Sequence, residues 1–136
     1  MAEAYIIDAV RTPRGIGKQG KGALAHMHPQ HLASTCLKAI KDRNDLDTAT
    51  VDDVIWSVST QDGMQAGDLG RMAALDAGYD ITSSGTTLDR FCGGGITSVA
   101  LAAAQVMRRS SETRRAINDG SPGEPARKAQ STFSTR

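Results

Sequence analysis

The sequence predicts an α/β fold built on a parallel sheet, with strands and helices alternating along the chain in βαβαβα order. Short β-rich runs recur, and a segment with helical periodicity follows each of them. Glycine, proline or aspartate stands where elements should begin or end. The 136 residues, 39% of them hydrophobic, suffice for one modest domain with a core. Strand–helix alternation repeated three times is typical of a parallel sheet.

The first strand and helix are predicted in the first third of the chain. Residues 4–10 are β-rich and Pro13 follows them, so we expect a strand there. A helix should cover Pro29–Arg43, because proline is favoured in a first helical turn and apolar residues recur at helical spacing. Cys36 lies on that apolar face, and we interpret it as a small core residue rather than a reactive thiol.

Two further strand–helix units follow. Residues 54–58 form the second predicted strand, and Asp68 is a suitable N-cap for a helix that ends before Gly78. A third extended run, residues 85–91, leads into a glycine triplet and a helix that should end near residue 107. This last helix is apolar nearly all round, which indicates burial on most sides, and it is too short to span a bilayer.

Cys92 lies between the third extended run and the last helix, so its thiol should stand at a helix start. Unpaired backbone N–H groups and the positive end of the helix dipole favour an anion there. The thiolate is the nucleophilic form of cysteine, so this placement favours an acyl-accepting role. The simpler alternative is a buried structural cysteine.

Glycines fill the predicted first turn after Cys92, although each lowers helix stability by about 0.5–1 kcal/mol relative to alanine. We interpret Gly93 and Gly94 as bare backbone that contacts substrate, with N–H groups facing a developing oxyanion. A flexible turn between strand and helix is the alternative. The spacing alone leaves both open.

Two motif-like strings have simpler explanations. Residues 15–20 fit G-x-G-x-x-G, but no helix opens directly after them, so we do not expect a nucleotide site. His26, His28 and His31 straddle a loop and a proline, and we interpret them as solvated histidines rather than metal ligands. We therefore expect no metal and no bound cofactor.

Composition divides the chain at residue 107. Residues 1–107 carry 9 basic and 12 acidic side chains, whereas residues 108–136 carry 7 basic and 3 acidic ones and few large apolar groups. The second segment should therefore be a basic tail that is disordered or read out of frame. No secretory signal is visible at the amino terminus, so we expect a cytoplasmic protein with no nucleic-acid or membrane partner.

Three blocks of the sequence resemble the amino-terminal portion of the thiolase family, the acetyl-CoA acyltransferases. They are Tyr5–Gly15 (YIIDAVRTPRG), Val54–Gly78 (VIWSVSTQDGMQAGDLGRMAALDAG) and Thr87–Met107 (TLDRFCGGGITSVALAAAQVM). The resemblance implies a partial thiolase-like amino-terminal domain over residues 1–107. It also implies that Cys92 takes an acyl group from a coenzyme A thioester and passes it to coenzyme A or to acetyl-CoA.

The resemblance further implies partners and missing parts. Intact thiolases associate as dimers or tetramers, and their catalytic histidines and second catalytic cysteine lie in blocks that have no counterpart here. We therefore expect this chain to be an inactive truncation, with the apolar edge of its first strand left unpaired. A ketoacyl-synthase-like condensing enzyme and a non-catalytic subunit-interaction fragment remain the alternatives.

Overall fold

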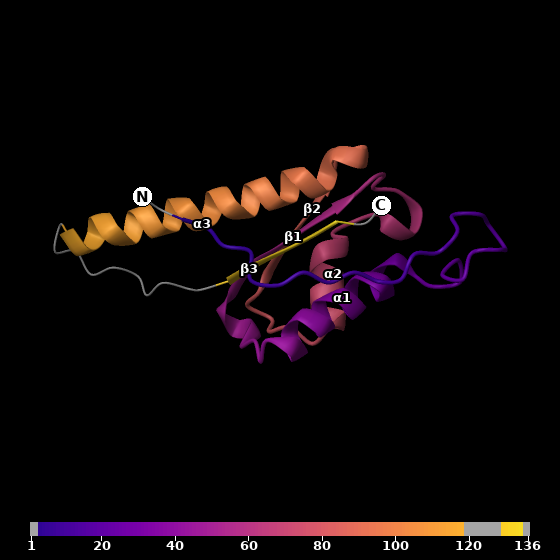
Figure 1. The fold of residues 1–136 in the computed structure, drawn as a ribbon, viewed down its shortest axis with the longest axis horizontal. Coiled ribbons are helices and arrows are strands. Elements are labelled where there is room, and N and C mark those ends of the chain that lie inside the picture. Colours follow the sequence, from indigo (N-terminus) through magenta and orange to yellow (C-terminus); the bar gives the residue numbers. More distant parts are fainter. Residues whose placement is uncertain (1–2, 119–128, 135–136) are drawn as a thin grey trace.

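The computed structural model describes the backbone of residues 3–118 and 129–134 and the side chains of residues 3–112. Helices α1 and α2 lie on one face of a parallel sheet, and the long helix α3 crosses the other face (Figure 1). The predicted α/β class and parallel sheet are confirmed. In chain order the elements are α1 (Pro29–Arg43), β1 (Val51–Val58), α2 (Leu69–Asp76), β2 (Ser84–Asp89), α3 (Gly94–Asn118) and β3 (Ala129–Ser134).

The sheet has the order β2-β1-β3 over the described residues, and β1 pairs in parallel with both neighbours. Val54 lies opposite Gly85 on one side and Ser131 on the other. Because helices cover both faces, residues 54–58 are all buried, which is typical of the central strand of a parallel sheet. The main core lies between the sheet and the α1–α2 layer and contains Trp56, Leu37 and Leu69.

The two shorter helices begin and end close to where the sequence predicts. Helix α1 covers the predicted range, although its fully buried face is centred on Ala33 and Leu37, and Cys36 is only half-buried. In α2, the Asp68 carboxylate caps the helix by accepting from the Arg71 N–H at 3.1 Å. Gly78 follows α2 with φ +74°, the left-handed conformation that glycine adopts without strain.

The predicted strand over residues 4–10 does not form. Tyr5, Ile6 and Ile7 are 78%, 83% and 82% exposed, and the segment makes no strand pairing among the described residues. A place beside the central strand β1 is not available to this segment, since β2 and β3 already pair with both sides of β1. The βαβαβα order is therefore wrong in detail, and the described elements alternate from α1 onward.

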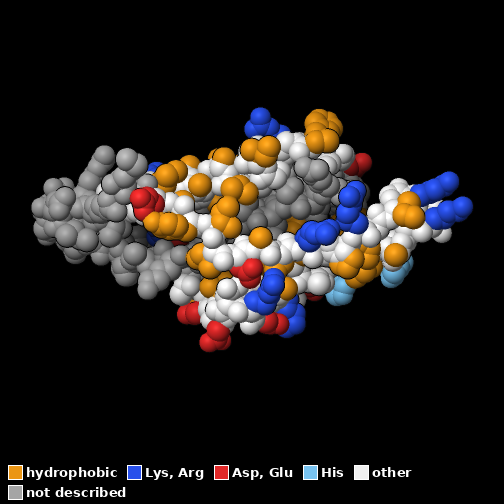
Figure 2. Space-filling model, viewed as in Figure 1, with side chains coloured by type: hydrophobic (Ala, Val, Ile, Leu, Met, Phe, Trp, Pro, Cys, Tyr) orange, Lys and Arg blue, Asp and Glu red, His pale blue; other side chains and the backbone are white. Residues whose placement is uncertain are grey.

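The expectation that the last helix is buried on most sides is also wrong. Helix α3 packs one face on the sheet, while Ile96 is 81% exposed and Val99, Leu101 and Met107 are also exposed. Apolar side chains lie along α3 on the face seen in Figure 2. Nothing among the described residues covers this outer face. No helix in the described part of the chain is long and apolar enough to cross a bilayer.

Helix α3 also continues past the predicted domain boundary at residue 107. An ion pair between Arg108 and Glu112 supports the helix at i,i+4 spacing, and Arg109 pairs with Asp52 of β1. Strand β3 forms within the segment for which the sequence predicts disorder. Residues 119–128 and 135–136 of the predicted tail lie outside the described residues.

Candidate functional site

Cys92 lies in a single 3-10 turn, Phe91–Gly93, that joins the end of β2 directly to the start of α3. Its side chain is exposed. The structure therefore places the thiol ahead of a helix, as the sequence predicts, and shows in addition that it is open to solvent. The alternative of a buried structural cysteine does not fit this exposure. Its role as a nucleophile stays a prediction at this point.

The turn that carries Cys92 is tight and strained. Phe91, a non-glycine residue, has φ +35°, in the left-handed region that L-residues rarely occupy. Such a conformation raises the energy by about 1–3 kcal/mol and persists only when surrounding contacts hold it. The strain falls on the residue directly before the thiol, so contacts around the turn determine where Cys92 points.

The N–H groups of both predicted substrate-binding glycines already have acceptors. The Gly93 N–H donates to the Arg90 carbonyl at 3.0 Å, and the Gly94 N–H donates to the Phe91 carbonyl. An oxyanion at these two N–H groups would compete with those carbonyls. Substrate contact at Gly93 and Gly94 therefore stays a prediction, and the turn geometry accounts for their hydrogen bonds without a substrate.

Gly94 has a packing role that sequence reasoning missed. A Cβ atom at this position would lie 1.6 Å from Ser57 Oγ and 2.7 Å from Ser57 Cβ on β1. Only glycine lets the first turn of α3 approach the strand this closely. The absence of a side chain at residue 94 thus follows from helix–sheet packing.

Polar side chains fix the end of β2 ahead of the turn. Thr87 donates from Oγ1 to the Asp68 carboxylate at 2.7 Å and accepts from the Gly70 N–H at 2.9 Å, which ties β2 to the start of α2. Asp89 accepts from the Gln61 N–H at 2.8 Å through its carboxylate, which ties β2 to the preceding loop. Sequence reasoning did not single out these side chains, because their partners lie 17–28 residues away along the chain.

A second set of contacts spans the turn itself. Arg90 donates from Nη1 to Thr97 Oγ1 at 2.8 Å, and the Thr97 hydroxyl donates to the Gly93 carbonyl at 3.2 Å. These side chains lie on either side of Cys92 in sequence, two residues before it and five after it. Sequence reasoning missed them as well. Their only signal is a basic and a hydroxyl residue at this spacing around a cysteine.

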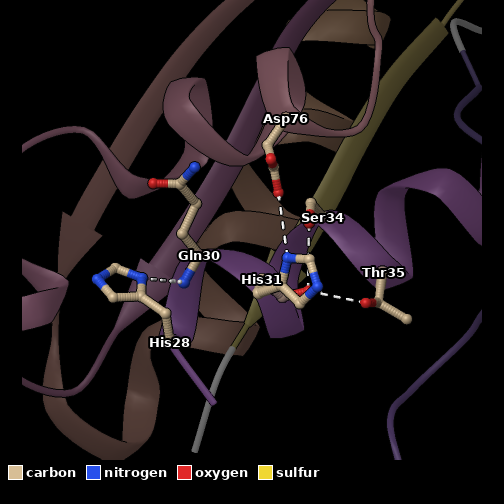
Figure 3. A network of polar contacts seen from close by, with 6 residues as sticks. All are labelled: His28, Gln30, His31, Ser34, Thr35 and Asp76. Carbon is tan, nitrogen blue, oxygen red and sulfur yellow. Dashed lines mark hydrogen bonds and ion pairs between the residues drawn. The ribbon is translucent and has the colours of Figure 1, made fainter.

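The remaining candidate residues lie elsewhere. Cys36 lies on α1, where burial raises the pKa of its thiol and a backbone hydrogen bond from Thr12 partly offsets that rise. His31 faces Asp76 with 3.6 Å between Nδ1 and Oδ2, and His28 accepts from the Gln30 N–H to cap α1 (Figure 3). His26, His28, His31 and Asp76 border an open depression of about 460 Å³.

The histidine group and Cys92 lie toward opposite ends of strand β2. Cys92 follows the carboxyl end of β2, whereas Asp76, the partner of His31, ends the helix that leads back to the amino end of β2. In the described part of the chain, no group of three or more histidine, cysteine, aspartate or glutamate side chains is placed to hold a metal ion.

Comparisons with known proteins match the part of the chain that contains the turn. The family model described as "Thiolase, N-terminal domain" matches residues 4–116. A steroid 3-ketoacyl-CoA thiolase of Mycobacterium tuberculosis is 44% identical over 107 residues. A 3-oxoadipyl-CoA/3-oxo-5,6-dehydrosuberyl-CoA thiolase of Escherichia coli is 40% identical over 107 residues, and a 3-ketoacyl-CoA thiolase of Psychrobacter cryohalolentis is 33% identical over 105 residues.

These matches cover most of this chain but a small part of each relative. The aligned segments make up 79%, 78% and 77% of this chain, in the order given above, and 26% of each relative. The chain therefore spans about a quarter of the length of the curated relatives that it matches.

Proposed function

Because the chain belongs to the thiolase family through its amino-terminal domain, we propose that Cys92 accepts an acyl group from a coenzyme A thioester. One observation carries the proposal: within the matched region, the thiol is exposed on a strained turn between a strand and a helix. The relatives are named as thiolases of CoA compounds, and we propose the same substrate class for this chain.

The proposed step exchanges one thioester for another. The deprotonated sulfur of Cys92 attacks the carbonyl carbon of the acyl-CoA, and the carbon–sulfur bond to coenzyme A breaks. Coenzyme A leaves as a thiolate and takes up a proton, which replaces the one that Cys92 released. The acyl group remains on Cys92 as a thioester. This step balances without a metal, an oxidant or a bound cofactor.

We further propose that the chain alone does not complete a turnover. Transfer of the acyl group to a second acetyl-CoA needs a base that removes a proton from its α-carbon. The three histidines of the chain are His26, His28 and His31, which lie at or near the start of α1, and its other cysteine, Cys36, lies within α1. We propose that none of these side chains serves as that base.

A non-catalytic role in subunit interaction is the second candidate function. The exposed apolar side chains of α3, with Phe91 beside the thiol, favour it, because faces of this kind often mark protein–protein contacts. A ketoacyl-synthase-like enzyme would use the same nucleophile on carrier-protein thioesters. The relatives named above favour CoA thioesters over that alternative.

The test is acylation of the full chain by acetyl-CoA. The chain is incubated with acetyl-CoA, the reaction is quenched in acid, and the mass of the intact protein is measured by mass spectrometry. We expect one acetyl group on the wild-type chain and on Cys36→Ser, and none on Cys92→Ser. Loss of the label on treatment with hydroxylamine identifies a thioester. No label on the wild-type chain, or a label that persists in Cys92→Ser, overturns the proposal.

A further inference from the structure

Arg90, Thr97 and Gly93 form a chain of hydrogen bonds, called the relay below, that links residues on either side of Cys92 in the sequence. Arg90 Nη1 donates to Thr97 Oγ1 at 2.8 Å, and the single proton of that hydroxyl is donated to the Gly93 carbonyl at 3.2 Å. The hydroxyl thus accepts from a residue that precedes Cys92 in the sequence and donates to one that follows it. A charged donor at one end of such a chain strengthens the bond that follows it.

The relay holds the residue that directly follows Cys92. The Gly93 N–H donates to the backbone carbonyl of Arg90 at 3.0 Å, and the Gly93 carbonyl accepts from Thr97. Both backbone polar groups of Gly93 are therefore fixed. Its N–H bonds to the backbone of Arg90, and its carbonyl bonds to the Thr97 hydroxyl, which in turn accepts from the Arg90 side chain. The Arg90 side chain lies along this residue, since a Cβ on Gly93 would be 3.7 Å from Arg90 Nε.

The strain at Phe91 gives this relay a function. With φ +35° at Phe91, the backbone before the thiol is in an unfavourable conformation, and it relaxes unless the turn is held. Arg90 and Thr97 hold it from both sides. Both side chains are exposed or only partly buried, so their contact adds little to the core.

We propose that Arg90 and Thr97 are positioning residues, which act through Gly93 to fix the direction in which the Cys92 thiol leaves its turn. The inference rests on the proposed function, in which that direction sets the approach to the thioester carbonyl. A displacement of about 1 Å at a reacting atom can lower a rate by as much as a hundredfold.

The test compares Thr97→Val, which removes the hydroxyl at nearly constant volume, with Thr97→Ser, which keeps it. Acylation of Cys92 is followed by intact mass over a range of acetyl-CoA concentrations. We expect Thr97→Val to lower the maximal acylation rate by about tenfold and Thr97→Ser to restore it to near the wild-type value. Arg90→Met should behave like Thr97→Val. Arg108→Met removes another exposed arginine from an i,i+4 pair and should have no effect.

Each outcome supports or overturns the positioning role of Arg90 and Thr97. Equal maximal rates for Thr97→Val and Thr97→Ser overturn the positioning role while the proposed function stands. A higher half-saturating acetyl-CoA concentration at an unchanged maximal rate also overturns it, because Arg90 would then bind substrate. If the wild-type chain is not acylated, the proposed function fails, and the relay is judged by alkylation of Cys92 with iodoacetamide. A rate that differs between the two Thr97 variants supports the relay, and equal rates overturn it.

Discussion

The two cysteines of this chain carry the same thiol in opposite surroundings. Cys36 is half-buried on α1, and burial raises the pKa of its thiol. Cys92 is exposed on a strained turn between β2 and α3. Neither surrounding follows from the residue type. The difference shows that the reactivity of a cysteine depends on the elements that meet at it.

Alkylation in the folded chain should distinguish the two cysteines most strongly. We expect iodoacetamide at neutral pH to modify Cys92 markedly faster than Cys36, because burial raises the pKa of the Cys36 thiol and also limits access of the reagent to it. Peptide mass spectrometry after brief labelling measures the ratio. In urea the two rates should converge, which is the internal control. Similar rates in the folded chain would remove the contrast between the two cysteines.

Gly94→Ala should disrupt the packing around Cys92 and leave the packing around Cys36 intact. The added Cβ would meet Ser57 Oγ at 1.6 Å, so the start of α3 must move away from β1. We expect the free energy of unfolding to fall by about 1–3 kcal/mol, as for other overpacked sites. Urea denaturation followed by circular dichroism measures it.

Gly17→Ala is the matched control for that substitution. A Cβ at Gly17 has no atom within 4 Å, and the residue is exposed. It should leave stability nearly unchanged. If Gly94→Ala proves as stable as Gly17→Ala, the close approach of α3 to β1 is wrong.

Much of the fold could be predicted from sequence, because its signals are local. Pro29 in the first turn of α1, the Asp68 cap and Gly78 after α2 each act on neighbouring backbone, and the structure confirms all three. The position of Cys92 ahead of a helix was predictable for the same reason.

The wrong predictions concern segments whose structure depends on residues that are distant in the sequence. Residues 4–10 and β1 are both β-rich, but β1 has strands on both sides and the amino-terminal segment has none among the described residues. Propensity cannot supply that partner. The Thr87–Asp68 contact and the approach of Gly94 to Ser57 join residues far apart in sequence, so spacing around Cys92 could not reveal them.

The alkylation rate of Cys36 and the stability of the chain should both change with pH in a defined direction. The pKa of the Cys36 thiol is raised because burial disfavours the thiolate, so in folded Cys92→Ser the alkylation rate should rise at a higher pH than in the same variant unfolded in urea. The same shift affects stability. Above the pKa of the unfolded thiol, near 8.5, the unfolded chain releases this proton more readily than the folded one, so the free energy of unfolding falls as pH rises.

Cys36→Ala separates that contribution from other alkaline effects. Its free energy of unfolding should decline less between neutral and alkaline pH than that of Cys92→Ser, which keeps the Cys36 thiol. Identical declines would show that deprotonation of Cys36 does not contribute, and the alkylation profile of Cys36 would then have to match that of the same thiol in the unfolded chain.

Substitution of Asp68, which joins α2 to the strand that leads to Cys92, should have the weakest effect. Its Oδ1 accepts from both the Arg71 N–H and the Thr87 hydroxyl. Asp68→Asn keeps a side-chain oxygen able to accept both bonds, whereas Asp68→Ala removes it and should lower the free energy of unfolding by about 1 kcal/mol. Because Thr87 would lose an anchor five residues before Cys92, Asp68→Ala should also alter alkylation of Cys92 and leave that of Cys36 unchanged. Equal changes at both thiols would mean general loosening of the fold, and the end of β2 would then have no particular part in holding the Cys92 turn.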